Sequence, residues 1–217
     1  MFNVCYNCGL YRADKLIDPA GPYAICPECG HRHPFRRLPL FIVGGASGSG
    51  KSTLCQALTG VVTEAVLLDA DLLWRPEFDR PEEGYRDYFE LWLRLCKNIG
   101  QSGRPVMLFG AGMGAPDNME PRVERRYFSR LHYLALVCED ERLAARLRGR
   151  PQWRASRDES FIEGQIQFNR WHKNHGPKAD PPIQLLDTTE LSVQDTARQI
   201  TQWLSEYLES KPENFAW

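Results

Sequence analysis

The sequence predicts an α/β protein: a five-stranded parallel sheet with helices on both faces, preceded by a small segment held together by metal. Two observations lead to this prediction. From residue 40 onward, short apolar runs alternate with longer amphipathic segments, whereas residues 1–39 hold two close pairs of cysteines instead. Such alternation is typical of parallel sheets whose crossover connections are helices. We therefore expect two domains, residues 1–39 and residues 40–217.

The individual elements follow from the same pattern. Short runs rich in Leu, Ile, Val or Phe predict strands at residues 40–43, 65–68, 105–109, 131–137 and 183–186. Helix-forming segments predict helices at residues 54–58, 82–99, 139–148, 158–171 and 193–208. Ligands of such sheets bind at the carboxyl ends of the strands, so the residues that follow each strand are the first candidates for a site.

Composition and charge narrow the class of protein. Of 217 residues, 42% are hydrophobic and 25% are charged, and 27 Lys and Arg face 28 Asp and Glu for a net charge of −1. This balance gives no general reason to expect nucleic acid or an anionic membrane as the partner. No apolar run approaches the roughly 18 residues of a membrane span, and residues 1–10 lack the features of a signal peptide. We expect a soluble, cytoplasmic protein that does not bind a membrane.

Four of the seven cysteines form two C-x-x-C pairs, Cys5 with Cys8 and Cys26 with Cys29, separated by seventeen residues. A glycine follows each pair and tolerates the left-handed backbone that turns N–H groups toward the sulfurs. Four thiolates at this spacing fit a closed tetrahedral zinc site, which is structural because no coordination position stays open. Residues 1–39 are too few to build a core of their own, so zinc would supply their stability.

The role of this predicted zinc ribbon is open between two alternatives. Its five Lys and Arg exceed its three acids, and with several tyrosines they could form a nucleic-acid surface. The alternative, which we favour, is docking on its own catalytic core or on a protein partner. His31 and His33 are expected at the surface, since four cysteines already complete the metal site. The remaining cysteines, Cys55, Cys96 and Cys138, are expected as small buried hydrophobic residues.

A glycine-rich segment, GGASGSGKST, lies between the first strand and the first helix of the expected sheet. From Gly45 it fits G-x-x-x-x-G-K-[ST], a phosphate-binding loop whose N–H groups surround phosphates at a helix N-terminus. Lys51 would bridge the β- and γ-phosphates, and Ser52 would ligate Mg²⁺. The expected nucleotide-binding residues of the loop are Gly45, Ala46, Ser47, Gly48, Ser49, Gly50, Lys51, Ser52 and Thr53.

Two acids end the second expected strand. Asp69 and Asp71 can divide the work of phosphoryl transfer, because one can hold Mg²⁺ while the other accepts a proton from an attacking hydroxyl. A capping role on the following helix would account for one of them instead. After the third strand, Gly110, Gly112 and Gly114 would allow a substrate to approach the backbone closely.

Arginines crowd a window without any acid, residues 142–157: Arg142, Arg146, Arg148, Arg150, Arg154 and Arg157. Guanidinium groups suit phosphate, so we expect a lid over about residues 142–160 that closes on the transferred group. Arg146 and Arg150 lie one helical turn apart on one face. A basic surface helix or an RNA-facing patch is the alternative interpretation.

The long connection over residues 74–88 mixes aromatic residues, charges and prolines, which suggests a flap that binds the phosphate acceptor. Trp74 and Arg75 could hold a planar or anionic acceptor there, or could simply pack on the surface.

Together, these motifs make residues 40–208 resemble the small P-loop kinases, the group of shikimate kinase, gluconate kinase, adenylylsulfate kinase and the nucleoside monophosphate kinases. The resemblance rests on the phosphate loop, the Leu-Asp-Ala-Asp segment, the glycines after the third strand and the arginine-rich stretch at 139–150. It implies the P-loop kinase fold, the use of ATP and Mg²⁺, and transfer of the γ-phosphate to a small molecule.

The same resemblance assigns roles to single residues. Asp71 would be the base for the acceptor, and Asp69 would organise the metal. One arginine of the lid stretch, Arg146 or Arg150, would stack on adenine, and Thr188 would belong to the far wall of the adenine site. With Lys51 and Arg150, these residues except Thr188 form the expected catalytic set. The zinc ribbon departs from the resemblance, since such kinases usually lack one.

The preferred function is therefore an ATP-dependent kinase acting on a hydroxyl or phosphate of a small molecule. A nucleoside or nucleotide is slightly preferred as acceptor, because Trp74, Tyr85 and Phe89 could stack on a base. One alternative is a polynucleotide 5′-hydroxyl kinase or a nucleic-acid-linked ATPase. A second is a non-catalytic module that binds ATP.

Overall fold

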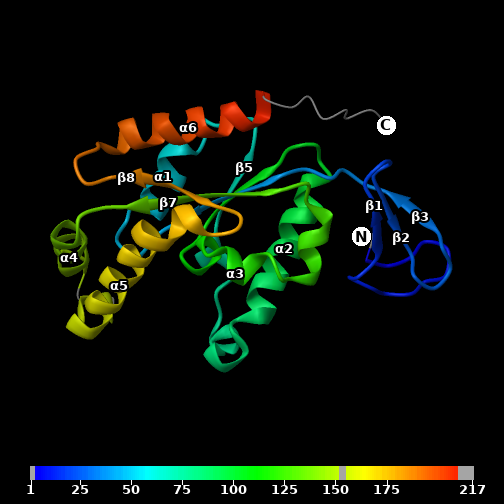
Figure 1. The fold of residues 1–217 in the computed structure, drawn as a ribbon, viewed down its shortest axis with the longest axis horizontal. Coiled ribbons are helices and arrows are strands. Elements are labelled where there is room, and N and C mark those ends of the chain that lie inside the picture. The colour runs from blue at the N-terminus through cyan, green and yellow to red at the C-terminus, as the bar shows by residue number, and fades with distance from the viewer. Residues whose placement is uncertain (1–2, 152–154, 210–217) are drawn as a thin grey trace.

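The computed structural model describes residues 3–151 and 155–209 and contains two separate sheets (Figure 1). The larger sheet has five parallel strands in the order β5-β6-β4-β7-β8. Its strands are β4 (Leu40–Gly44), β5 (Val66–Asp69), β6 (Val106–Phe109), β7 (Leu131–Val137) and β8 (Ile183–Asp187). The predicted five-stranded parallel sheet is confirmed, and the expected strand ends differ from the observed ones by a residue at most.

Helices cover both faces of this sheet. Along the central strand β4, successive side chains point to opposite faces, so both faces are buried and the strand is apolar throughout. Phe41 and Val43 pack with one apolar cluster that includes α1 and α6, whereas Leu40 and Ile42 pack with a second one that includes α2. The α-helices are α1 (Lys51–Leu58), α2 (Arg86–Gly100), α3 (Pro116–Met119), α4 (Asp140–Arg148), α5 (Glu159–His175) and α6 (Val193–Glu209).

Short 3₁₀ helices fill several connections. They are η1 (Ala70–Leu73), η2 (Pro76–Phe78), η3 (Pro81–Glu83), η4 (Gly112–Gly114), η5 (Val123–Tyr127), η6 (Ala155–Arg157) and η7 (Gly176–Lys178). The helix predicted from residue 82 begins only at Arg86, because Gly84 and Tyr85 adopt left-handed backbone with φ of 59° and 52°. None of the described helices is long and apolar enough to cross a bilayer.

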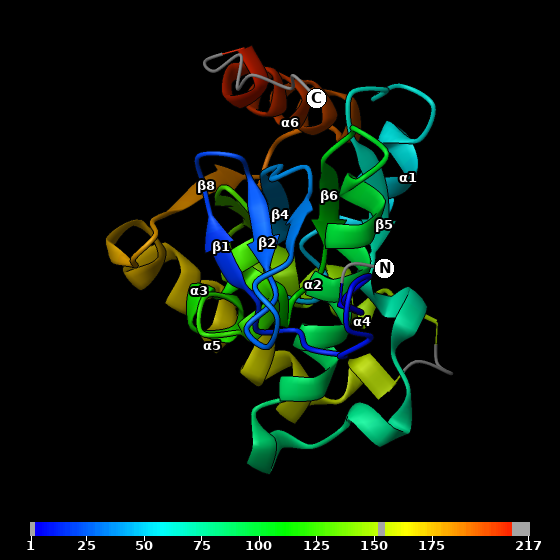
Figure 2. The same cartoon turned by 90° about the vertical axis from the view of Figure 1, so that its right-hand side faces the viewer.

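The smaller sheet belongs to the N-terminal segment. Its antiparallel strands β1 (Leu16–Asp18), β2 (Tyr23–Ile25) and β3 (Arg32–Pro34) lie beside α2 and apart from the larger sheet (Figures 1 and 2). His31 is exposed as expected. The expectation for His33 is wrong, because the alternation of β3 turns this residue inward, where it is 1% exposed and 4.6 Å from the His31 ring.

This segment is attached to the rest of the chain by η5. Tyr127 packs with Ala24 and Phe35, and its hydroxyl donates a hydrogen bond of 2.5 Å to the carbonyl of Ala13. Arg126 donates to the carbonyls of Asp14 and Lys15 at 3.1 and 3.2 Å. Backbone carbonyls of the segment are thus satisfied by side chains of the larger unit.

A buried ion pair stands at the same junction. The ammonium of Lys97, on α2, contacts the carboxylate of Glu124, and the two side chains are 1% and 0% exposed. Asn3 bridges them, donating to Glu124 at 3.2 Å and accepting from Lys97, while Arg94 donates to Glu124 at 2.9 Å. Burial lowers the pKa of Lys97, and the charge of Glu124 opposes that shift.

A second buried ionisable group lies on α5. His172 is fully buried, and neither of its ring nitrogens has a hydrogen-bond partner among residues 3–151 and 155–209. It packs against the ring of Phe168 and lies next to Gly114. Burial, together with the positive charge of Lys51, lowers the pKa of His172 to about 4. His172 is therefore neutral in the folded protein at neutral pH.

We expect Glu124→Gln to destabilise the protein by about 3–5 kcal/mol, because the buried ammonium of Lys97 would lose its charged partner. The measurement is the urea midpoint at pH 7. Glu83→Gln is the matched control, since Glu83 pairs with Arg80 at the exposed surface and its loss should leave the midpoint unchanged. Equal midpoints for the two variants would contradict a buried ion pair at this junction.

We also expect the stability of the folded protein to fall at acidic pH because of His172. A histidine whose folded pKa lies below its unfolded value disfavours the folded state as pH falls from about 6.5 toward 4, because the unfolded chain then binds more protons. Between pH 7 and pH 5 this costs about 2 kcal/mol. His172→Leu should lose that part of the pH dependence in urea titrations, whereas His175→Leu, at an exposed position of the same helix, should keep it. If the stability of the two variants depended on pH in the same way, the buried, neutral state inferred for His172 would be contradicted.

Candidate active site

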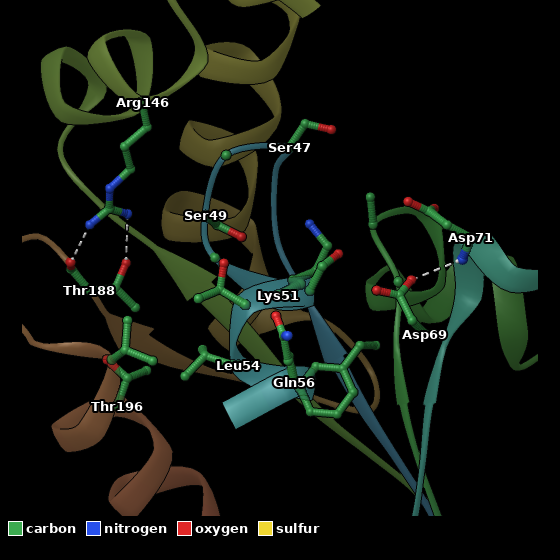
Figure 3. Close-up of a pocket in the computed structure, with 18 of the residues that line it drawn as sticks. Ser47, Ser49, Lys51, Leu54, Gln56, Asp69, Asp71, Arg146, Thr188 and Thr196 are labelled. Atoms are coloured by element: carbon green, nitrogen blue, oxygen red, sulfur yellow. Dashed lines mark hydrogen bonds between the residues drawn. The ribbon is translucent and has the colours of Figure 1, made fainter. Parts of the chain in front are cut away.

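A cavity of about 590 Å³ opens at the carboxyl ends of the parallel strands (Figure 3). Its walls include most of the sequence-predicted site, and these residues come from the end of β5 and from the segments that follow β4, β5, β6, β7 and β8. The predicted residues that line it are Ser47, Gly48, Ser49, Gly50, Lys51, Ser52, Thr53, Asp69, Asp71, Gly110, Arg146, Arg150 and Thr188. The topology alone thus gathers groups that lie up to 141 positions apart in the chain.

The glycine-rich loop leaves β4 and turns into the N-terminus of α1. Gly45, Gly48 and Gly50 have φ of 122°, 88° and 108°, a backbone region that side chains with a Cβ rarely adopt. A Cβ on Gly45 would lie 2.4 Å from the carbonyl oxygen of Leu136, so the loop crosses β7 too closely for any other residue. The first N–H groups of α1 have no partner within the helix, and they form the positive end of its dipole.

Lys51 spans this loop from inside. Its ammonium donates hydrogen bonds to the carbonyls of Gly45 and Ala46 at 2.8 and 2.9 Å. Burial lowers the pKa of Lys51 to about 8, with Asp71 and Asp69 raising it and Arg150 lowering it. The hydroxyl of Ser49 is buried in the cavity wall without a hydrogen-bond partner in the described part of the chain. The loop therefore offers N–H, O–H and ammonium donors, a set that fits a phosphate chain.

The two acids stand together where β5 ends. A carboxylate oxygen of Asp69 accepts the N–H of Asp71 at 3.0 Å and so caps η1, as the capping alternative anticipated for one of them. Both still line the cavity, on the side of Lys51 that lies away from Arg146 (Figure 3). The buried Tyr88 donates a 2.6 Å hydrogen bond to the carbonyl of Ala70 and fixes the turn between them. A hydroxyl on Ser52 and a carboxylate on Asp69 are the oxygen donors that Mg²⁺ prefers.

The arginines of the expected lid separate into different environments. Arg146 donates to the hydroxyl and the carbonyl of Thr188 at 3.2 and 2.8 Å, and Arg150 lines the cavity. Arg148 instead forms a two-pronged ion pair with Glu159, at 2.8 and 2.7 Å. The sequence places no acid inside this window, and the anion that neutralises Arg148 is Glu159 on α5, just beyond it, rather than a phosphate. Arg154 lies outside the described residues.

Several predicted acceptor residues lie away from the cavity wall. Trp74 and Arg75 are exposed, and the Trp74 ring packs edge-on against Tyr88 at 5.2 Å. Gly114 is buried, and a Cβ there would lie 2.7 Å from the Cα of Gly44. The absence of a side chain at Gly114 is thus explained by close backbone packing. Gly112 is exposed but lies outside the cavity lining as well.

Sequence reasoning missed a group of lining residues: Leu54, Gln56, Phe109, Ala111, Leu191, Val193 and Thr196. Most come from one side of α1 and from the beginning of α6, where no short motif marks them. The sequence carries only an indirect signal for them. Helix α6 packs beside α1, and this packing brings the first turn of α6 to the edge of the sheet where the cavity opens.

The four N-terminal cysteines meet in the structure. Their Sγ atoms all lie within 4.8 Å of one another, with 3.6 Å between Cys5 and Cys29 and 3.8 Å between Cys8 and Cys26. A tetrahedral ion with Zn–S bonds of about 2.3 Å requires sulfurs roughly 3.8 Å apart, so the group can hold one metal ion. Of the other cysteines, Cys96 and Cys138 are buried as expected; Cys55 is only half-buried.

Comparison with known proteins finds solved structures with a similar fold but no similar sequence. No protein-family model and no curated protein matches the sequence. Solved structures do: a sugar kinase from Janibacter sp. HTCC2649 aligns with 77% of this chain and 95% of its own at 16% identity and a TM-score of 0.58. A gluconokinase from Sinorhizobium meliloti 1021 aligns with 81% of this chain and 96% of its own, at 20% identity and a TM-score of 0.54.

A third solved structure, the tunicamycin resistance protein of Deinococcus radiodurans, aligns over 78% of this chain and 96% of its own, at 16% identity and a TM-score of 0.54. These similarities concern the arrangement of the backbone. The chain has the P-loop kinase fold.

Proposed function

We propose that the protein is an ATP- and Mg²⁺-dependent phosphotransferase that moves the γ-phosphate to a hydroxyl or phosphate of a small molecule. One observation carries this proposal: a single cavity holds a phosphate loop with Lys51 and, beside it, the carboxylates of Asp69 and Asp71. A module that only stores nucleotide needs no second acid there. The kinase fold, which the chain shares with a sugar kinase and a gluconokinase, supports the same reaction class.

The roles of the nucleotide-binding residues follow from their donors. The loop N–H groups would surround the phosphates, and the Lys51 ammonium would exchange its two carbonyl partners for phosphate oxygens. Ser52 and Asp69 would hold Mg²⁺, which when bound neutralises phosphate charge and orients the reacting group. Arg146, held flat by Thr188, would cover the base, and Arg150 would screen charge on the transferred group.

Asp71 is the proposed base toward a hydroxyl acceptor. As the acceptor oxygen forms its bond to the γ-phosphorus, the bond from that phosphorus to the β-phosphate oxygen breaks, and the hydroxyl proton passes to the Asp71 carboxylate. The side chain is exposed, so it can reach an acceptor that enters from the open side of the cavity. A phosphate acceptor would need no such proton transfer.

For the acceptor we propose nucleosides and nucleotides first, with sugars and sugar acids next. Trp74 is 44% exposed, and its ring lies 6.1 Å from that of Tyr85, so a planar ring could add to this pair. Phe89 cannot contribute as expected, because it is 3% exposed and packed in the core.

A polynucleotide substrate has less support. Of the five basic residues in the ribbon, Lys15 is fully buried, and Arg12 and Arg32 are paired with Asp14 and Asp18. Three of the five positive charges of the ribbon are therefore already neutralised or covered.

We expect Asp71→Asn to lower acceptor-dependent ADP release by about 10²- to 10⁴-fold while leaving ATP binding intact, because the base is lost but the loop is not touched. A coupled assay with a panel of nucleosides, nucleotides, sugars and sugar acids identifies the acceptor and then measures the rate. Asp79→Asn, an exposed acid of the same connection outside the cavity lining, should keep the full rate. A full rate in Asp71→Asn would remove Asp71 as the base.

We further propose that residues 1–39 form a zinc ribbon domain, with Cys5, Cys8, Cys26 and Cys29 as the ligands, and that residues 40–217 form the kinase domain. The purified protein should then contain one zinc per chain by elemental analysis. Cys26→Ser should lose the metal and lower the melting temperature, since zinc supplies the folding energy of so small a unit. Cys55→Ser should keep the zinc. A full complement of zinc in Cys26→Ser would contradict this ligand set.

A further inference from the structure

The tip of the phosphate loop is held from outside the loop. The side-chain oxygen of Gln165 accepts the backbone N–H of Ser47 at 2.7 Å, across 118 positions of sequence. Ser47 lines the cavity, whereas Gln165, on α5, does not. The bond therefore holds the loop by a contact from outside the cavity lining.

The same helix is also fastened to the base of the lid. One turn beyond Gln165, the fully buried Asn169 accepts the N–H of Cys138 at 3.3 Å and donates to its carbonyl at 2.8 Å. Asn169 also donates to the carboxylate of Asp140, at 3.1 Å. Cys138 and Asp140 join β7 to α4, the helix that carries Arg146, and α4 and α5 lie side by side (Figure 1). Two amide side chains thus tie α5 to the phosphate loop and to the lid helix.

The loop tip touches the lid helix directly as well. A Cβ on Gly48 would lie 3.1 Å from side-chain atoms of both Leu143 and Leu147, on α4. The tip is therefore set between an apolar contact on α4 and a hydrogen bond from α5. A neutral amide suits the second position, because a carboxylate there would add negative charge behind a site for a triphosphate.

We propose that Gln165 is a positioning residue for nucleotide binding: it keeps the tip of the phosphate loop in its binding shape and links that shape to the lid helices. The inference rests on the proposed function, since it concerns the same nucleotide site. It adds a residue that lies outside the cavity lining and that no motif identifies. Loss of its hydrogen bond frees the Ser47 amide and lets the tip sample other conformations, which costs binding energy.

The test compares Gln165→Leu with Gln167→Leu, a matched change at an exposed position of the same helix. Titration calorimetry with MgATP and with MgADP, without acceptor, should show binding about tenfold weaker for Gln165→Leu, the worth of one hydrogen bond, and no change for Gln167→Leu. Hydrogen exchange should be faster over residues 45–50 in Gln165→Leu only. Wild-type affinity, or tighter binding, in Gln165→Leu would overturn the proposal.

Gln165→Glu serves as the second variant. Its carboxylate can still accept the Ser47 N–H, so exchange over residues 45–50 should stay slow, while the added charge should weaken binding of MgATP. Exchange as fast as in Gln165→Leu would show that the hydrogen bond does not hold the loop, and would overturn the proposal. If the wild-type protein bound no ATP, the proposed function would fail, whereas the exchange comparison would still report on the role of Gln165.

Discussion

The close passage of the phosphate loop between neighbouring backbones is the constraint on which the rest of the site depends. Gly44 lies against Gly114, and Gly45 lies over the carbonyl of Leu136, at separations that leave no room for a Cβ. The loop is therefore fixed between β7 and the segment after β6. Since α1 continues from the loop, its N-terminus and Lys51 are placed by the same contacts. The cavity opens at the edge where the parallel strands end, with Asp69 at the end of β5 and Thr188 just after β8.

Burial then sets the electrostatics of this edge. Lys51 is held among backbone carbonyls, and the two aspartates favour its charged form while Arg150 opposes it. These like and unlike charges surround one cavity before any ligand is present. A phosphate chain would bring negative charge between Lys51 and Arg150 and relieve the repulsion that they exert on each other. The arrangement thus favours a polyanion on simple Coulombic grounds.

Sequence reasoning recovered the elements whose signals are local. A four-residue apolar run followed by a glycine-rich loop identified β4 and α1, and the two C-x-x-C pairs anticipated the cysteine cluster. It failed where the cause is tertiary. Gly114 was expected to contact a substrate, because its packing against Gly44 is not visible in the sequence. Arg148 pairs with Glu159, an acid outside the arginine-rich window. The contact of Gln165 with Ser47 joins segments that share no motif.

Helix α2 is clamped near both of its ends. Toward its C-terminus, Lys97 is enclosed by Glu124 and Asn3, and toward its N-terminus Tyr88 holds the turn that carries Asp69 and Asp71. By composition the chain can be divided after residue 39, but hydrogen bonds join the two sides of this division, among them those of Asn3 with Lys97 and Glu124. A truncated protein that starts at Leu40 would keep the Lys97–Glu124 pair but lose Asn3, which contacts both side chains on the inner side of this helix. The residues before the compositional boundary thus complete the surroundings of a charge pair that lies after it.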